Sequence, residues 1–161
     1  SASIMEMPAL YDNVFQVSQE LLAQDMAYNL GDRFFSDADR ISDVLKEWIV
    51  KGLSLNAKKY LTNFAALQKM RMSFNALMDH YDFAIAPASS GEAPLGLHNT
   101  GSPNFCLLWT SIGVPVVNVP ILTGPNGLPV GVQIIGRYGA DVETISAAAW
   151  LGRKLKVKMF Y

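Results

Sequence analysis

Short apolar runs separated by glycine and proline fill the second half of this sequence. Three of them are Tyr-Asp-Phe-Ala-Ile-Ala-Pro at 81–87, Gly-Val-Pro-Val-Val-Asn-Val-Pro at 113–120 and Gly-Leu-Pro-Val-Gly-Val-Gln-Ile-Ile-Gly at 127–136. The second and third are rich in β-branched residues, the first combines aromatic residues with Ile85, and each ends at a proline or glycine, which is typical of buried strands. The first run leads into a long polar loop at 88–101, and a compact domain rarely keeps such a loop without a use. The pattern therefore predicts strands that hold a functional loop, as in the pocket walls of α/β enzymes.

Helical signals lie between and after these runs. Ser102 followed by Pro103 predicts the start of a short helix that ends at Gly113, because a hydroxyl caps a helix and proline suits its first position. The residues at 125–127, Pro-Asn-Gly, predict a tight turn. The predicted order over 81–156 is strand, crossover helix, strand, strand, helix. This order is typical of an α/β layer with helices on both faces of a sheet.

The first half of the chain has a helical period instead. Apolar residues recur every three or four positions, which predicts three amphipathic helices at about 8–30, 39–51 and 56–80. Gly31 and Gly52 are expected to end the first two of these helices. A chain of 161 residues can form one domain with a sizeable core. We therefore expect a single unit (1–161), in which a helical segment (8–80) covers the strand-containing core (81–156).

Composition and charge exclude several classes of partner. The formal net charge is −1 and half of the residues are hydrophobic, so nothing favours nucleic acid or an anionic membrane. No apolar run is long enough to span a membrane, and no signal-peptide pattern occurs. A single cysteine, Cys106, excludes an internal disulfide framework and suits a reducing, cytoplasmic compartment. Two histidines and one cysteine without ligand spacing lead us to expect neither a metal site nor a cofactor.

The residues by themselves do not define a catalytic group. Ser89 and Ser90 follow a predicted strand, but a nucleophile also needs a base and an oxyanion pocket, and the pattern Gly-x-Ser-x-Gly is absent. His98 in the same loop leaves a serine–histidine–acid arrangement open. A polar turn is the preferred interpretation of the serine pair. The glycines near 127–136 match neither a phosphate loop nor a dinucleotide fingerprint.

The order of the segments resembles the C-terminal half of amidase signature enzymes, which are serine amidohydrolases. The matching text includes the three strand sequences quoted above, Glu-Ala-Pro at 92–94, Thr-Gly-Ser-Pro at 100–103 and Phe-Cys-Leu-Leu-Trp at 105–109. The resemblance covers nearly the whole chain. It implies part of an α/β/α sandwich with a mixed central sheet, preceded by a helical segment.

The resemblance also implies what is missing. The family hydrolyses carbon–nitrogen amide bonds with a Ser–Ser–Lys triad that lies in its N-terminal half, and no Gly/Ser-rich signature of that kind occurs here. No catalytic residue is therefore carried over. The family loop that matches 100–105 faces the bound substrate, so the resemblance implies a substrate-binding wall made of Thr100, Gly101, Ser102, Asn104, Phe105 and Trp109. For Ser102, a role as helix cap is an equal alternative.

Three hypotheses follow. The first is the C-terminal portion of an amidase, inactive alone, whose partner is the N-terminal half of the domain and whose substrate in the complete enzyme is a small-molecule amide. The second is a stand-alone, non-catalytic binding module derived from the same fold. The third is a separately made polypeptide that pairs with an N-terminal half. In the first case the sheet has an unpaired edge and an apolar face, so we expect self-association to a dimer or higher oligomer.

Overall fold

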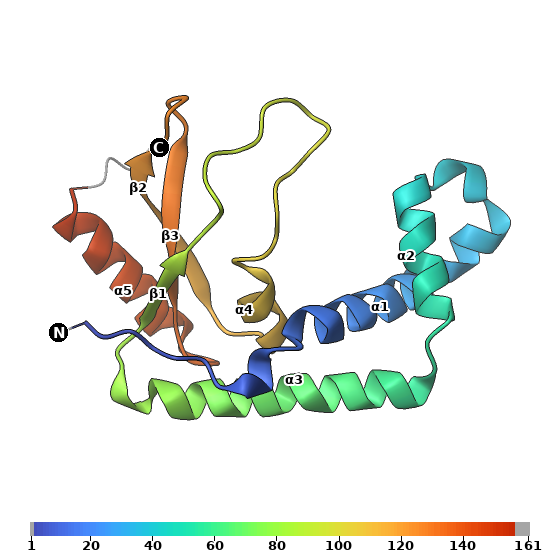
Figure 1. Cartoon of the computed structure of the whole chain (residues 1–161), viewed down its shortest axis with the longest axis horizontal. Helices are drawn as coiled ribbons and strands as arrows, with labels where there is room; N and C mark the ends of the chain where they lie inside the picture. Colours follow the sequence, from blue (N-terminus) through green and yellow to red (C-terminus); the bar gives the residue numbers. More distant parts are fainter. Residues whose placement is uncertain (1, 157–161) are drawn as a thin grey trace. The chain divides into compact units, whose positions relative to one another are not determined.

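A computed structural model describes residues 2–156 of the chain (Figure 1). The residues fall into two compact units, Ser1–Met70 and Arg71–Tyr161, and each is described separately below. The described part contains five α-helices and one small antiparallel sheet of three strands, so the chain is a mixed α/β protein. Within residues 2–156, every helix is too short or too polar to serve as a membrane span.

The first unit is helical. After the short 3-10 helix η1 (Ala9–Tyr11) come α1 (Val14–Ser36), η2 (Ala38–Arg40), α2 (Asp43–Leu53) and the first part of α3 (Ala57–Leu77). Three helices were predicted here and three α-helices occur, although α2 begins later than expected. Its start is set by Ser42, whose side chain accepts a hydrogen bond from the backbone N–H of Leu45. This contact satisfies one of the N–H groups that a helix start leaves without a partner.

Gly31 does not end the first helix, contrary to the prediction. Helix α1 continues through Gly31 to Ser36. Helix α1 makes its main contact with α2. Ala23, Ala27 and Gly31 repeat every four residues and are buried. A Cβ built on Gly52 of α2 would meet Ala23 and Ala27, so these two small residues lie at the contact, whereas a Cβ on Gly31 would meet nothing within 4 Å. Gly31 does not have the left-handed φ of a helix end, and it continues the helix instead.

Within the first unit, Glu20 in α1 connects this helix to α3 through a hydrogen bond and an ion pair. Its carboxylate accepts hydrogen bonds from Gln16 Nε2 (3.0 Å) and Asn63 Nδ2 (2.7 Å) and forms an ion pair with Lys59 Nζ (3.0 Å). Asn63 is buried, so its amide depends on this acceptor. Desolvation raises the pKa of Glu20, but the three donors outweigh that effect and hold the pKa below its ordinary value.

The second unit holds the sheet, whose strand order is β1-β3-β2. The strands are β1 (Ala84–Pro87), β2 (Val116–Thr123) and β3 (Pro129–Ile135). Ala84 pairs with Ile135 on one side of β3 and Val116 pairs with the same residue on the other, both in antiparallel register. A bulge interrupts the β2–β3 ladder between Pro120 and Leu122. Strand β3 therefore lies in the centre, and β1 and β2 lie on its two sides.

This topology corrects the expected strand–crossover–strand unit. The predicted helix between the first two strands exists as α4 (Leu107–Ile112), but β1 and β2 do not pair with each other. They run parallel to each other because both are antiparallel to β3, which is inserted between them. Helix α4 also begins later than predicted, at Leu107, because Ser102 and Pro103 form turns ahead of it. Its end at Gly113 is confirmed, with φ +69° in the left-handed region.

Helix α5 (Asp141–Lys154) covers one face of the sheet. Val119, Ile134 and Ala148 are buried there, and further apolar side chains pack around them: Phe83, Val117, Ile121, Val132, Ala147 and Leu151. Ile145 and Leu155, although apolar, are exposed. The inward face is centred on the small residue Ala148, which allows the helix to lie close to the sheet.

Candidate functional site

The most unusual feature of the second unit is the loop at 88–106, which leaves the end of β1 and returns to α4. Figure 1 shows it as a long excursion without regular secondary structure. Leu95 and Leu97 at its far end are fully exposed. Two short contacts shape the returning arm: Asn99 Oδ1 accepts from the Gly101 N–H at 2.8 Å, and Ser102 Oγ accepts from the Asn104 N–H at 3.3 Å. Such turns present backbone and side-chain polar groups outward.

Glu92 attaches this loop to the turn between β2 and β3. Its carboxylate accepts hydrogen bonds from the backbone N–H of Asn126 (3.0 Å), the side-chain amide of Asn126 (2.7 Å) and the backbone N–H of Leu128 (3.0 Å). The turn is the predicted one, closed by bonds from Gly127 N to Gly124 O and from Gly124 N to Leu128 O. Desolvation raises the pKa of Glu92, but the hydrogen bonds from Asn126, Leu128 and Gly127 lower it below its ordinary value.

Gln133 attaches the two ends of the loop to the centre of the sheet. It is buried at 2% exposure in β3, and its Nε2 donates to the carbonyl oxygen of Pro87 (2.8 Å) and to that of Phe105. Pro87 ends β1 before the loop and Phe105 precedes α4 after it, so one side chain fixes both ends. The Ala88 N–H adds a bond to Gly131 O at 3.1 Å. The loop thus has a rigid base and an exposed outer part.

The predicted binding residues divide between these two parts. Thr100, Gly101, Ser102 and Asn104 are exposed on the returning arm, and Phe105 is half-buried at its base. Trp109 is 9% exposed, and its ring packs against Phe74 with centroids 5.2 Å apart. The structure therefore places five of the residues on one arm, whereas Trp109 belongs to α4 and is buried in the core.

Within the part of the chain that the structure describes, neither serine of the pair at 89–90 is hydrogen-bonded to a base. Ser89 Oγ donates to Gly91 O at 2.6 Å, and no hydrogen bond joins Ser90 or His98 to a partner. Cys106 is exposed and its Sγ donates to Pro103 O. Between residues 2 and 156, no three histidine, cysteine or acidic side chains come together as metal ligands would. These residues offer polar surface groups, not an activated serine.

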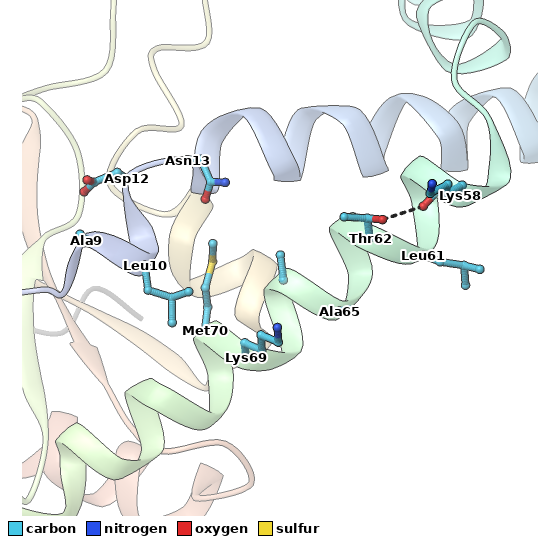
Figure 2. A pocket seen from close by; sticks show the side chains of 11 residues that line it. Ala9, Leu10, Asp12, Asn13, Lys58, Leu61, Thr62, Ala65, Lys69 and Met70 are labelled. Carbon is cyan, nitrogen blue, oxygen red and sulfur yellow. Dashed lines mark hydrogen bonds between the residues drawn. The ribbon is translucent and has the colours of Figure 1, made fainter.

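Two surface hollows are lined by other residues than those of this arm. The larger, about 820 Å³, belongs to the first unit and is lined by Ala9 and Leu10 of η1 and by one face of α3 from Lys58 to Met70 (Figure 2). Figure 2 shows Lys58 and Lys69 at this face, with Thr62 bonded to the backbone of Lys58. The second, about 590 Å³, lies in the second unit beside Thr110, Pro115, Tyr138 and Asp141. Neither is lined by the predicted binding residues.

Sequence reasoning missed two residues that organise the site. Glu92 lies in the quoted Glu-Ala-Pro segment, but its partners are 34 and 36 residues away, so no local pattern reveals them. The role of Gln133 could have been predicted from the sequence, because it is the one polar residue in the otherwise apolar strand β3. A buried polar side chain must find partners, and this rule alone indicates a structural or functional role for Gln133.

The comparisons with known proteins agree with this architecture. The Amidase family model matches residues 6–145, so the chain belongs to the amidase family. The A subunit of mitochondrial glutamyl-tRNA(Gln) amidotransferase from Rattus norvegicus is 27% identical over 130 residues, 71% of this chain and 25% of that protein. The A subunit of the glutamyl-tRNA(Gln) amidotransferase from Archaeoglobus fulgidus is 29% identical over 141 residues, 76% of this chain and 29% of that protein.

Solved structures show the same fold. A crystal structure of an amidase has a TM-score of 0.82 at 24% identity and covers 95% of this chain, but only 38% of its own chain is matched. A 6-aminohexanoate cyclic dimer hydrolase with bound substrate has a TM-score of 0.72 at 17% identity, with 91% of this chain and 36% of that chain covered. The chain thus corresponds to part of an amidase signature domain and spans between a quarter and two fifths of these larger relatives.

Proposed function

We propose that this chain is the C-terminal portion of an amidase, which supplies a wall of the substrate pocket but not the catalytic triad. The observation that carries the proposal is the combination of a family match over residues 6–145 with coverage of only 38% of a solved amidase. In the complete enzyme, a lysine acts through a bridging serine to activate the nucleophilic serine, which attacks the amide carbonyl to form an acyl-enzyme. These groups come from the part of the fold that this chain does not match.

The exposed arm at 100–104 is the proposed wall. Thr100, Ser102 and Asn104 offer hydroxyl and amide groups at its surface, and Phe105 offers an apolar edge. Trp109 supports the wall from the core by packing on Phe74. The small antiparallel sheet would then join the remaining strands to form the mixed sheet of an α/β/α sandwich, with a small-molecule amide as the substrate.

The purified chain is expected to hydrolyse no simple amide above the buffer rate, because among the described residues neither Ser89 nor Ser90 is hydrogen-bonded to a base. The measurement is ammonia release from a panel of aliphatic and aromatic amides, repeated with Ser89→Ala and Ser90→Ala. Co-expression with an amidase N-terminal region that carries the Gly/Ser-rich signature is expected to restore turnover. Turnover by the chain alone that either alanine variant abolishes would overturn the proposal.

Self-association is the second expectation, because β1 and β2 each pair only with β3 among the described residues. One side of each outer strand is left unpaired, and such edges invite pairing with another chain. Ile85 and Leu122 on these strands are 52% and 62% exposed. We expect multi-angle light scattering to give a dimer or larger species, which Ile85→Lys and Leu122→Lys shift toward the monomer. A monodisperse wild-type monomer would contradict this.

A further inference from the structure

We propose that Glu92 is a positioning residue, which holds the loop at 88–106, including the arm with Thr100, Ser102 and Asn104, in one conformation by binding the β2–β3 turn. The inference rests on the proposed function only in taking this arm as the substrate-facing wall. The attachment itself is a property of the chain and can be tested without any substrate.

The geometry favours an attachment through a single carboxylate. Asn126 donates twice to Glu92, from its backbone N–H and from its side-chain amide, and the backbone N–H of Leu128 donates to Oε1. Hydrogen bonds to an ionised acceptor are shorter and stronger than those between neutral groups. Apart from this contact, the loop at 88–106 is hydrogen-bonded to the sheet, among the described residues, only near its ends, at Ala88 and Phe105. Glu92 is therefore placed to restrain the exposed middle of the loop.

The turn is shaped to receive this side chain. A Cβ atom built on Gly124 would overlap the Cγ and carboxylate atoms of Glu92. Because Gly124 has no left-handed φ, alanine can adopt its backbone conformation. The clash is with a flexible side chain, so Gly124→Ala should displace the carboxylate and leave the turn in place. This substitution breaks the attachment while it keeps residue 92 as glutamate.

The charge on Glu92 has no competing partner nearby. The turn at 123–129 contains no titratable side chain, and the loop at 88–106 contains only His98 and Cys106 besides Glu92. No hydrogen bond joins either of them to Glu92, and Cys106 bonds instead to Pro103. The donors to Glu92 are neutral amides, whose charge does not change with pH. Protonation of Glu92 therefore removes the charge that strengthens the bonds and replaces one acceptor oxygen with a hydroxyl.

The pH dependence follows from the direction of the pKa. Because the folded-state pKa of Glu92 is lowered, the attachment contributes fully above the unfolded value and is lost as the pH falls through the folded value. The test is NMR on the ¹⁵N-labelled chain. The amide shifts of Asn126 and Leu128 are expected to titrate together with a midpoint below the ordinary glutamate pKa of about 4.3. Order parameters at 93–101 are expected to fall over the same pH range.

Two variants and one control complete the experiment. At neutral pH, Glu92→Gln and Gly124→Ala are each expected to lower the order parameters of 93–101 and to speed exchange of the Asn126 and Leu128 amides by roughly tenfold or more. Glu143→Gln, which removes an exposed carboxylate from α5 in the same unit, should change neither. In Glu92→Gln the acid titration of the two amides should disappear.

The possible outcomes distinguish the positioning role of Glu92 from the proposal that residues 100–104 form a substrate-binding wall. Unchanged loop order in both variants, or amides of 126 and 128 that do not titrate in the wild type, would overturn the positioning role. If a variant does not fold, the wild-type titration decides alone. A confirmed attachment with no substrate effect of Thr100→Ala or Asn104→Ala in the restored enzyme would instead leave Glu92 as proposed and refute the wall.

Discussion

Gln133→Glu is expected to destabilise the second unit by about 3–5 kcal/mol at neutral pH, the range for a buried charge without a partner. The substitution keeps the shape of the side chain but turns its amide into a carboxylate. The new oxygen would face the carbonyl oxygens of Pro87 and Phe105, which now accept hydrogen bonds from Nε2. Two hydrogen bonds become two repulsions, and a charge is placed at a position with 2% exposure.

The pH dependence distinguishes this cause from a packing defect. Burial and the two carbonyl oxygens raise the folded-state pKa of the introduced acid above its unfolded value. Between these two values the folded state binds more protons, so stability falls as the pH rises. The deficit should therefore be smaller at pH 5 than at pH 8, because a protonated acid donates one hydrogen bond.

Urea unfolding followed by tryptophan fluorescence measures the deficit, because Trp109 and Trp150 lie in this unit. Gln133→Leu removes both donors without adding charge and should cost less, about 1–3 kcal/mol, with no dependence on pH. Gln19→Glu, at an exposed position of α1, is the matched control and should change stability little. If Gln133→Glu is as stable as the wild type at pH 8, the buried geometry at this residue is wrong.

Local signals predicted the elements of the second half well. Strand β3 (Pro129–Ile135) lies within the run at 127–136 that was predicted as a strand, because turn formers border a β-branched run. Gly113 ends α4 in the left-handed conformation, as a glycine at a helix end usually does. These features depend on a few neighbouring residues, and the sequence displays all of them. The wall residues Thr100–Asn104 remain a prediction, since they rest on the family resemblance.

Pairing between distant segments was not predictable in the same way. Nothing in the sequences of β1, β2 and β3 says that β3 lies between the other two, because an apolar strand can pair with any neighbour. The contact from Glu92 to Asn126 likewise joins two loops, in which no period shows which side chains meet. The prediction that α1 ends at Gly31 was wrong because a glycine can also continue a helix, and no neighbouring residue in the sequence decides between the two.

Gly52→Ala is expected to destabilise the first unit by about 1–3 kcal/mol or more, although alanine is the better helix former. The propensity gain of about 0.5–1 kcal/mol favours the variant. Against it, a Cβ at position 52 would overlap the carbonyl oxygen of Ala23 and crowd the Cβ of Ala27. These atoms are rigidly attached to the backbone of α1, so relief requires α2 to move away from α1. The steric cost therefore exceeds the propensity gain.

Gly31→Ala is the matched control, because Gly31 also lies within a helix but a Cβ there meets nothing within 4 Å. It should stabilise the unit by about 0.5–1 kcal/mol through propensity alone. Each of the two variants adds one methyl group within a helix, and the expected changes in the free energy of unfolding have opposite signs. Thermal unfolding followed by circular dichroism at 222 nm, with Trp48 fluorescence as a probe of α2, measures both. A stabilising Gly52→Ala would mean that α1 and α2 are farther apart than described, because only then does propensity decide.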